Sequence, residues 1–486
     1  MEITELYKIF SEHPVVTTDS RDCPEGSLFF ALKGASFDGN KFAAMALDKG
    51  CAYAVVDEAE YAPEGDSRYI LCDDCLTTLK QLALYHRRTL ATPIIGITGT
   101  NGKTTTKELT AAVLQQKYNV LYTQGNFNND IGVPKTLLRL RPEHEIAVVE
   151  MGASHPGDIK ALVDVVEPDY AIITNVGRAH LQGFGSFEGV IHTKGELYDF
   201  MRANHGIDNT DNGKMLCGSK APQSCVFIDS ENPYLNGIAL GLNLVLYGCK
   251  DDDQLWVSGH VDSCSPMLSF TWRHNDGTAV GAPHATPTHL IGEYNITNML
   301  AAVSIGLYFC VPADSIVKAL SAYVPSNNRS QFEQTADNRL IVDAYNANPT
   351  SMAAALRNFA DIDAKGKMVI VGDMKELGEV SHDEHQRIVD QLRQMTLDQV
   401  WLVGSEFEGC DTPSGFRLFD NVEKVKEAIA ADKPHDKYIL IKGSNGTKLF
   451  QLPELLSMRK DLLCFPKGLL LKNKEGLIAR VYQNRS

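Results

Sequence analysis

The chain has 486 residues, of which 44% are apolar and 22% charged, and its formal net charge is −15. This length predicts two to four domains with ample core, in a soluble globular protein. No basic cluster matches a nucleic-acid backbone, which excludes nucleic acid as an expected partner. Because there is neither a signal peptide nor an apolar run long enough to span a bilayer, the expected location is cytoplasmic.

The cysteines give little indication of a disulfide framework. There are eleven of them, an odd number, and they are scattered, which suits reduced thiols in a cytoplasm. The only CxxC motif is Cys72-Asp-Asp-Cys75. Since no second pair stands at zinc spacing, we interpret this pair as structural rather than as a redox or metal site.

The chain order predicts a small first domain over residues 1–91. A buried strand is expected at 27–32, a turn at Asp38-Gly39, a helix at 42–49 and another strand at 53–56. An amphipathic helix at 76–88 closes the domain, and Thr92-Pro93 is typical of a linker.

A second domain is predicted over residues 92–324. Strands and helices alternate there, with strands at 94–97, 119–122, 146–150 and 170–175 and helices at 104–116 and 157–166. This alternation predicts a doubly wound parallel sheet in an α/β fold. Residues 251–290 are β-like instead, a helix is expected at 298–308, and the polar stretch 204–224 is typical of a surface loop.

A third domain is predicted over residues 325–486, again α/β and Rossmann-like. Four strand–turn units are expected at 340–343, 367–372, 399–404 and 438–443. Several end in glycine, which suits ligand binding at the carboxyl ends of parallel strands.

The most informative stretch is the glycine-rich turn after the strand at 94–97. Gly99, Gly102, Lys103 and Thr104 stand in the order of a phosphate-binding loop: backbone N–H groups approach the oxygens, the lysine neutralises charge and the hydroxyl binds magnesium. Ile97 occupies a position where the strict motif has glycine. The alternative is an ordinary glycine turn between a strand and a helix.

Two further strand ends carry polar side chains. Glu150 ends a buried strand where a magnesium-directing carboxylate belongs, although a solvated strand-end glutamate is the alternative. The next strand is followed by Thr174-Asn175 and, a few residues on, His180. Lys194 lies fourteen residues further along, and no local rule links it to His180.

Other candidates each have a plain structural alternative. Asn295 and Asn298 can share a helix face and present amides to a planar ring, or they can cap the helix. Arg329 can stabilise a transferring phosphoryl group, or it can be an exposed linker charge. Asp343 can bind ribose hydroxyls with the asparagines after it contacting a polar substrate, or it can begin an Asx turn.

Taken together, these motifs resemble the Mur ligases, the ATP-dependent amino-acid-adding enzymes of bacterial peptidoglycan synthesis. The resemblance covers essentially the whole chain in order and is carried by these stretches: Thr18-Asp-Ser-Arg21, Leu32-Lys-Gly34, Thr98-Gly-Thr-Asn-Gly-Lys-Thr-Thr-Thr106, Gly125-Asn-Phe-Asn-Asn-Asp-Ile-Gly-Val-Pro134, Glu150-Met-Gly-Ala153, Asn175-Val-Gly-Arg-Ala-His180, Tyr345-Asn-Ala-Asn-Pro349 and Gly372-Asp-Met-Lys-Glu-Leu-Gly378 with His382 or His385 after it. Ile97 is then a family trait. Lys442-Gly-Ser444 also matches, while Asn445 and Thr447 depart from the usual residues.

The resemblance implies a three-domain ligase with a central phosphate-binding domain. Within the family the motifs are most similar to the member that adds D-alanyl-D-alanine to UDP-N-acetylmuramoyl-tripeptide. ATP would phosphorylate the tripeptide's terminal carboxylate, and the incoming amine would displace phosphate through a tetrahedral intermediate. The third domain would close over ATP, and the enzyme is expected to be a monomer.

It also implies residue roles. Catalysis would fall to Lys103, Glu150, His180, Lys194 and Arg329. Thr104 and Glu150 would hold one Mg²⁺, and His180 with a carbamylated Lys194 a second, since a carbamate offers a hard cation an anionic oxygen. The nucleotide would contact Gly99, Thr100, Asn101, Gly102, Lys103, Thr104, Thr105, Asn295, Asn298, Arg329 and Asp343. The UDP-linked substrate would contact Ser20, Arg21, Lys33, Asn128, Asn346 and Asn348.

The nearest rivals are the diaminopimelate- or lysine-adding ligases and folylpolyglutamate synthase. Asn126-Phe-Asn-Asn129 and Tyr345-Asn-Ala-Asn348 argue against them, and the uridine-type first domain argues against a folate substrate. A nucleotide-dependent switch is the rival from another class, but it would not need Glu150, His180 and Lys194 together. No residue identifies the third amino acid of the tripeptide.

Overall fold

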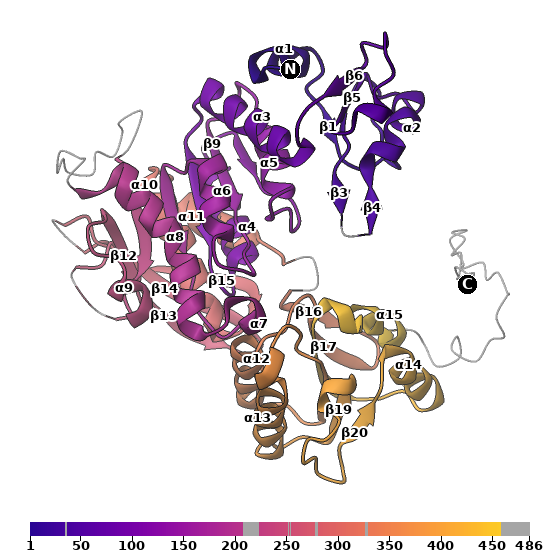
Figure 1. Ribbon diagram of the computed structural model, residues 1–486. Coiled ribbons are helices and arrows are strands. Elements are labelled where there is room, and N and C mark those ends of the chain that lie inside the picture. The colour runs from indigo at the N-terminus through magenta and orange to yellow at the C-terminus, as the bar shows by residue number, and fades with distance from the viewer. Residues whose placement is uncertain are drawn as a thin grey trace, which may run out of the picture. The chain divides into compact units, whose positions relative to one another are not determined.

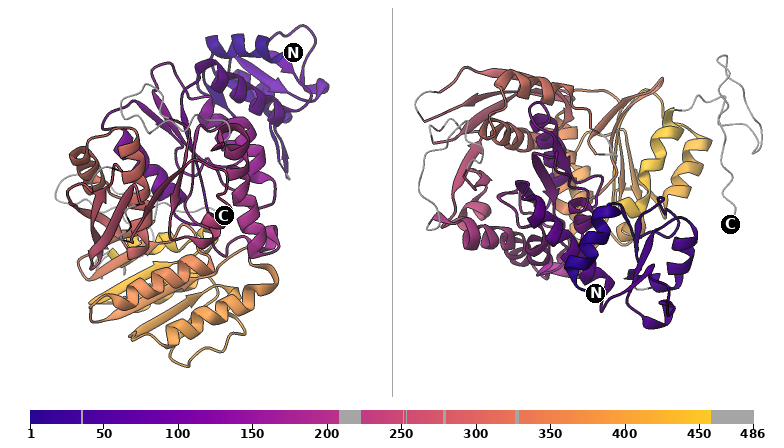
Figure 2. Two further views of the ribbon diagram at one scale, coloured as in Figure 1. Left: turned by 90° about the vertical axis from the view of Figure 1, so that its left-hand side faces the viewer. Right: turned by 90° about the horizontal axis from the view of Figure 1, so that it is seen from above.

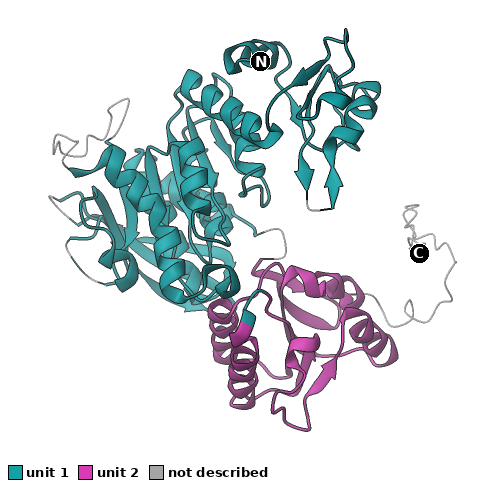
Figure 3. Cartoon of the chain, viewed as in Figure 1, with its two compact units in different colours: residues 1–325, 376–378 teal, residues 326–375, 379–486 magenta. Residues whose placement is uncertain are grey.

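The computed structural model describes residues 1–34, 36–207, 223–250, 252, 254–277, 280–325 and 329–457. The chain divides into two compact units, the first made of residues 1–325 with 376–378 and the second of 326–375 with the residues after 378 (Figures 1 and 3). Each unit is described by itself below. In the described part of the chain, no helix is both long and apolar enough to cross a membrane.

The first unit begins with a small parallel sheet. Its strands run in the order β1 (Val16–Thr17), β2 (Leu28–Phe30), β5 (Tyr53–Val56) and β6 (Tyr69–Leu71). The hairpin β3 (Lys33–Gly34) and β4 (Phe37–Asp38) leaves this sheet, and the associated helices are α1 (Ile3–Glu12), α2 (Ala43–Asp48) and α3 (Cys75–Leu90).

The second sheet of this unit has nine strands. Their order is β15 (His284–Ile291), β14 (Met267–His274), β13 (Val257–Cys264), β12 (Leu244–Gly248), β11 (Val226–Asp229), β10 (Tyr170–Ile173), β7 (Ile94–Thr98), β9 (Ile146–Glu150) and β8 (Val120–Tyr122). The strands from β8 to β13 pair in parallel, whereas β13, β14 and β15 form an antiparallel end. The change matches the β-like residues of 251–290.

Helices bury both faces of this sheet. One apolar core packs α4 (Lys103–Leu114), α10 (Ile296–Tyr308) and α11 (Ala313–Ala322) against it, and a second packs α5 (Gly132–Leu137), α6 (Asp158–Val166) and α8 (Phe187–His205) on the other side. This part of the unit also contains two short helices, α7 (Leu181–Phe184) and α9 (Pro233–Gly237). The second core continues through α3 into the small sheet, so this sheet and one face of the nine-stranded sheet share an apolar core.

The second unit is a six-stranded sheet between helices. The strand order is β16 (Gln331–Gln334), β17 (Asn338–Asp343), β21 (Lys437–Lys442), β18 (Lys367–Gly372), β19 (Gln399–Val403) and β20 (Arg417–Phe419), with only β16 antiparallel to its neighbour. Helices α12 (Pro349–Asp361) and α13 (Ser381–Arg393) lie on one side, and α14 (Val422–Ala431) and α15 (Leu452–Ser457) on the other (Figures 1 and 2). Apolar residues therefore follow one another without alternation in its parallel strands.

The predicted α/β class is confirmed, with local differences. The central sheet is parallel as predicted but extends into an antiparallel end, and the helix predicted from residue 298 begins at Ile296. The helix predicted at 42–49 is shorter, because a 3₁₀ turn takes Gly39–Phe42. Most of the predicted loop at 204–224 lies outside the described residues, and the domain boundaries after residues 91 and 324 stay predictions.

One buried arginine joins helix α3 to the end of helix α6. Arg87 donates from Nε to the Val166 carbonyl at 3.0 Å and from Nη2 to the Glu167 carbonyl at 2.8 Å. The same Nη2 lies 2.9 Å from Asp169 Oδ2. Because the last carbonyls of a helix have no partner within it, this guanidinium satisfies groups that would otherwise be buried unpaired.

We expect Arg87→Met to lower the free energy of unfolding by about 2–4 kcal/mol, since it leaves buried acceptors unpaired. The matched control is Arg88→Met, whose exposed guanidinium pairs with Glu167 and should contribute about 0.5 kcal/mol or less. Urea denaturation followed by circular dichroism measures both. Equal losses in the two variants would contradict the role given to Arg87.

Candidate active site

A glycine-rich loop joins β7 to α4 at the carboxyl edge of the nine-stranded sheet. Gly99 has φ +142°, and a Cβ there would lie 2.0 Å from Thr174 Oγ1. Gly102 has φ +77°, and a Cβ there would lie 2.5 Å from Asn298 Oδ1. A side chain at either position would be strained and would collide with its neighbour, so both positions require glycine.

The loop is fastened to the end of the neighbouring strand β10. Asn175 accepts from the Thr100 N–H through its carbonyl and from the Asn101 N–H through Oδ1, both at 2.9 Å. The Thr174 hydroxyl and the Asn175 amide donate to the Asn101 carbonyl at 2.6 and 3.0 Å. The polar residues after β10 therefore hold the loop, a role that the sequence did not reveal.

Helix α4 begins at Lys103, directly behind this loop. Lys103 Nζ donates to the carbonyls of Gly99 and Thr100 at 2.8 and 3.0 Å, so the cation is folded over the loop. The helix N-terminus adds positive potential at the same place. This is the combination that binds a polyphosphate, and the geometry favours the phosphate-binding interpretation over an ordinary glycine turn.

Glu150 is buried beside the loop, not solvated as the alternative had it. Its side chain is 1% exposed. The Thr104 hydroxyl lies 3.1 and 3.0 Å from its two carboxylate oxygens, and Asn128 Nδ2 donates to Oε1 at 2.8 Å. A hydroxyl and a carboxylate this close are the oxygen ligands that Mg²⁺ prefers, so these two residues fit the predicted metal site.

Lys107, a buried cation near Glu150, was not identified from the sequence. Lys107 is fully buried one helical turn after Lys103; its Nζ lies 4.0 Å from Glu150 Oε2 and donates to the Gly125 carbonyl at 3.3 Å. It lies on the α4 face that packs toward the sheet. The spacing Lys103-Thr-Thr-Thr-Lys107 was the available signal, because residues four apart share a helix face.

His180 and Lys194 come from two successive helices and converge on Phe184. His180 precedes α7 with φ +51°, and its ring centroid lies 6.1 Å from that of Phe184. Lys194 lies in α8 with Nζ 5.5 Å from the same ring. The short α7 returns the chain so that both side chains approach one aromatic residue.

Burial dominates the electrostatics of both groups. It lowers the pKa of Lys194 well below the ordinary range of a lysine, and nearby Lys103 lowers that pKa further. Burial also lowers the pKa of His180. The Lys194 amine donates one long hydrogen bond, 3.4 Å to the Ala153 carbonyl. Burial thus favours the neutral form of both groups, in which an imidazole binds metal and an amine adds to carbon dioxide. At His180 the Glu376 carboxylate, which contacts Nδ1, raises the pKa and opposes burial.

Within the described residues no three His, Cys, Asp or Glu side chains are grouped to hold a metal ion. The predicted ligands are of a different kind, because they include a hydroxyl and a lysine beside a carboxylate and an imidazole: Thr104, Glu150, His180 and Lys194. The first pair fits a hard cation as it stands. The second pair fits only if Lys194 carries an anionic oxygen, so the carbamate stays a prediction.

Asn295 and Asn298 are buried under the phosphate-binding loop. Asn298 Nδ2 donates to Asn295 Oδ1 at 2.9 Å, and its own Oδ1 accepts from the Thr106 hydroxyl at 3.1 Å. Asn295 Nδ2 donates to the Ile291 carbonyl at 2.7 Å, and its side chain makes no capping hydrogen bond. The capping alternative is therefore wrong, whereas contact with adenine stays a prediction.

The predicted substrate residues of the small sheet pair with acids. Arg21 binds Asp19 through two hydrogen bonds of 2.9 and 2.8 Å, beside the half-buried Ser20. Lys33 Nζ lies 2.9 Å from Asp57 and 2.9 Å from Glu58. Their substrate contacts stay predictions, as does that of Asn128, which the structure places at Glu150 instead.

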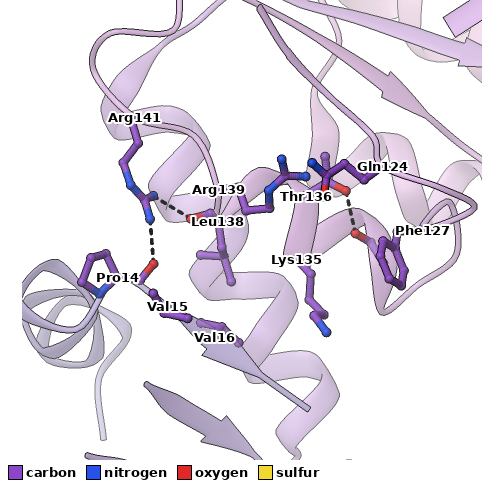
Figure 4. Close-up of a pocket in the computed structure, with 11 residues that line it drawn as sticks. Pro14, Val15, Val16, Gln124, Phe127, Lys135, Thr136, Leu138, Arg139 and Arg141 are labelled. Carbon is purple, nitrogen blue, oxygen red and sulfur yellow. Dashed lines mark hydrogen bonds between the residues drawn. The ribbon is translucent and has the colours of Figure 1, made fainter. Parts of the chain in front are cut away.

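A pocket of about 210 Å³ lies between strand β1 and helix α5 (Figure 4). Apolar side chains such as Val15 and Phe127 share its lining with three cations, Lys135, Arg139 and Arg141. Arg141 is engaged by backbone carbonyls, among them Pro14 at 2.7 Å (Figure 4). Burial lowers the pKa of Lys135 and Arg139, so an anion here would meet poorly solvated cations.

The second unit carries its candidates around the end of β17. Lys442, the last residue of β21, places its Nζ 2.6 Å from Asp343 Oδ2 and donates to the Asn346 carbonyl at 3.3 Å. Asn348 caps α12, accepting from the Ser351 N–H at 2.9 Å. Substrate roles for Asn346 and Asn348 and a ribose role for Asp343 stay predictions.

Arg329 and the glycine motif at 372–378 have separate local contacts. The Arg329 guanidinium carbon lies 3.9 Å from the centre of the Tyr345 ring, and its Nε is buried with no hydrogen-bond acceptor among the described residues. Of His382 and His385, the buried His385 makes the contact: Nε2 accepts from the Met374 N–H at 3.1 Å and Nδ1 bonds the Ser381 carbonyl at 2.7 Å. That histidine therefore holds the turn of the motif.

Comparison with protein families matches three successive models: "Mur ligase family, catalytic domain" at residues 14–87, "Mur ligase middle domain" at 97–306 and "Mur ligase, glutamate ligase domain" at 328–445. Two curated proteins named UDP-N-acetylmuramoyl-tripeptide–D-alanyl-D-alanine ligase are similar. That of Bacillus subtilis is 33% identical, with 90% of this chain and 92% of the relative covered, and that of Escherichia coli 34%, with 91% and 93%.

Solved structures agree. A crystal structure of MurF from Acinetobacter baumannii has a TM-score of 0.77 at 30% identity, covering 91% of this chain and 93% of that one. MurF ligase from Thermotoga maritima, in complex with ADP, has a TM-score of 0.76 at 25% identity, covering 91% and 97%. The three-domain architecture implied by the sequence is confirmed.

We expect Asn175→Ala to weaken ATP binding about tenfold, because it removes two hydrogen bonds that hold Asn101, together worth about 1–1.5 kcal/mol. Titration with a fluorescent ATP analogue measures the dissociation constant. Asn236→Ala, in which an exposed amide on α9 is lost, is the control and should bind ATP normally. Unchanged binding in Asn175→Ala would show that the loop keeps its shape without this strand end.

Proposed function

Because the chain belongs to the Mur ligase family, we propose that it is the ATP-dependent ligase that joins D-alanyl-D-alanine to UDP-N-acetylmuramoyl-tripeptide, forming the UDP-linked pentapeptide. The observation that carries the proposal is the buried Thr104–Glu150 pair behind a phosphate-binding loop. Lys194, whose pKa burial lowers, belongs to the same unit. The names of the matched relatives, over nine-tenths of the chain, support this member of the family.

The reaction follows from carboxylate chemistry. A carboxylate does not form an amide with an amine directly, because its negative charge makes the carbon a poor electrophile and it has no good leaving group. The tripeptide's terminal carboxylate therefore first takes the γ-phosphoryl group of ATP. The amine of D-alanyl-D-alanine then attacks the acyl phosphate, and phosphate leaves from the tetrahedral intermediate. Protons from the attacking amine are lost to solvent or a nearby base, and the products are the amide, ADP and phosphate.

The loop residues bind and orient the phosphates. The loop from Gly99 to Gly102 surrounds the phosphates, while the N–H groups of Thr100 and Asn101 stay bonded to Asn175. Lys103 offers a cation that can turn from its own loop to a phosphate oxygen, and the backbone N–H groups of Thr104 and Thr105, in the first turn of the helix, face the anion. Lys107 keeps net charge at Glu150 low, which holds that carboxylate in place before nucleotide binds. Positioning and charge stabilisation of this kind supply most of the catalysis in phosphoryl transfer.

Magnesium ions, when bound, would neutralise charge on the phosphoryl oxygens that are transferred. Thr104 and Glu150 would hold one ion, and His180 with carbamylated Lys194 a second. The carbamate is reasonable for this chain because a buried amine with a lowered pKa is nucleophilic at neutral pH and can add to carbon dioxide.

The UDP-linked substrate is anionic and needs cations at its site. We place its nucleotide end at the small sheet, with Ser20, Arg21 and Lys33, and its anionic middle near Lys135 and Arg139 in the pocket of Figure 4. The remaining roles are those expected from the resemblance. Arg329 would contact the γ-phosphate and Asp343 the ribose. Adenine would contact Asn295 and Asn298, and the substrate would contact Asn346 and Asn348. Dependence on ATP and a UDP-linked precursor favours a cytoplasmic location. We also propose that the enzyme is a monomer.

The direct test measures phosphate release from ATP with UDP-N-acetylmuramoyl-tripeptides that end in meso-diaminopimelate or in lysine. We expect release with at least one tripeptide, dependent on D-alanyl-D-alanine, and a UDP-linked pentapeptide by mass spectrometry. Diaminopimelate or lysine offered with the UDP-linked dipeptide is the control for the rival ligases. Release with that pair instead of D-alanyl-D-alanine would overturn the assignment.

Lys194→Ala should lower the rate of product formation by on the order of 100-fold or more, since it removes an anionic metal ligand. Acetate should restore part of the activity, because it supplies the missing carboxylate oxygen. Removing dissolved carbon dioxide should slow the unsubstituted enzyme, and bicarbonate should reverse this. Lys160→Ala, an exposed lysine paired with Asp164 on α6, is the control. Full activity in Lys194→Ala would sink the carbamate.

A further inference from the structure

Two cysteine thiols face each other where strand β6 gives way to helix α3. Cys72 follows the last residue of β6, and Cys75 is the first residue of α3. Their Sγ atoms lie 3.8 Å apart, and both are free thiols. The sequence spacing alone favoured a structural role for this pair, whereas two free thiols at this distance are also close enough to form a disulfide after side-chain rotation.

The backbone holds the pair in this arrangement. The Cys72 N–H donates to the Val56 carbonyl at 2.9 Å, and the Cys75 N–H donates to Asp57 Oδ2 at 3.2 Å. Asp57 is in turn fixed by Asn40, whose Nδ2 donates to it at 2.8 Å. With both backbones anchored, rotation of the side chains is what has to bring the sulfurs to the bonding distance of about 2.05 Å.

The two thiols differ in access to solvent. Cys72 is partly exposed, whereas Cys75 is 1% exposed. Each thiol donates to a backbone carbonyl 3.4 Å from its Sγ, Cys72 to Val56 and Cys75 to Val55. A dissolved reagent can therefore reach the first sulfur and not the second. In a CxxC pair, this asymmetry separates an attacking cysteine from a resolving one.

Their acidities differ in the same sense. The side-chain hydrogen bond between Cys72 and Cys75 lowers the pKa of Cys72 to about 7, against the opposing influence of burial and of the carboxylates of Asp57 and Asp74. That same hydrogen bond and burial raise the pKa of Cys75. A thiolate is the nucleophile in thiol–disulfide exchange, so the accessible sulfur is also the reactive one at neutral pH.

We propose that Cys72 and Cys75 form a reversible redox modification site, at which a low-molecular-weight disulfide oxidises the pair to an intramolecular disulfide. The Cys72 thiolate attacks one sulfur of the reagent, forming a mixed disulfide and releasing one thiolate. Cys75 then loses its proton and attacks the Cys72 sulfur, forming the Cys72–Cys75 bond and releasing the second thiolate. Two protein thiols and one disulfide thus become one protein disulfide and two small thiols.

The test equilibrates the reduced full-length chain with mixtures of reduced and oxidised glutathione, quenches in acid, alkylates with N-ethylmaleimide after unfolding, and digests with trypsin. Cleavage after Arg68 and Lys80 places both cysteines on one peptide, residues 69–80. We expect this peptide to change from the doubly alkylated form to an unalkylated form that lacks two hydrogens, with dithiothreitol reversing the change.

Single variants separate the two roles. Cys75→Ser should accumulate a glutathione adduct on Cys72, because no second thiol resolves it, and Cys72→Ser should leave Cys75 unmodified because it is buried. Cys249→Ser, a half-buried thiol elsewhere in the same unit, should oxidise at residues 72 and 75 like the unsubstituted chain. Persistent double alkylation of the 69–80 peptide in excess oxidised glutathione would overturn the proposal, as would a stable glutathione adduct in the unsubstituted chain.

Discussion

The site depends first on strand register at the carboxyl edge of the nine-stranded sheet. Strand β7 pairs with β9 so that Ile97 lies opposite Glu150, and with β10 so that Thr98 lies opposite Ile173. The loop after β7 therefore emerges between Glu150 on one side and Thr174-Asn175 on the other. A shift of one residue in either pairing would reverse the side chains and remove the carboxylate or the fastening of the loop. Gly99 is needed because this register brings Thr174 too close for a Cβ, and Gly102 is needed because Asn298 of helix α10 lies too close for one.

Burial then decides the chemistry of each charged group. Glu150 stays inside only because a hydroxyl, an amide and the Lys107 cation lie around it, since an unpaired buried carboxylate would take up a proton. At Lys194 the carboxylates of Asp158 and Glu196 raise the pKa by less than burial and Lys103 lower it, so burial shifts this side chain toward the neutral amine. A carbamate-assisted metal site would depend on both conditions, a buried carboxylate with hydrogen-bonding and cationic neighbours and a buried amine whose pKa is lowered.

The sequence predicted those parts of the fold and site that are encoded locally. Buried strands, the phosphate-binding loop and the carboxylate at the end of β9 were predicted because apolar periodicity and glycine spacing are local signals. Contacts that join distant residues were not, such as Asn128 with Glu150, Asn175 with the loop, and Lys442 with Asp343. These contacts follow from register and helix packing, which no local pattern carries. The convergence of His180 and Lys194 depends likewise on the left-handed residue before α7.

The cysteine pair also shows that a local sequence pattern does not determine which side chains are in contact. Spacing could exclude a zinc site, because that requires a second pair in the sequence, but it could not say whether two thiols touch. Contact arises because Cys72 leaves the small sheet and Cys75 enters α3, with Asp57 and Asn40 fixing the junction. Asp57 also pairs with Lys33, one of the residues expected to meet the UDP-linked substrate. The Asp57 carboxylate that accepts from the backbone of the buried thiol is thus the same one that pairs with the Lys33 ammonium, so the cysteine junction and the Lys33 hairpin share one anionic partner.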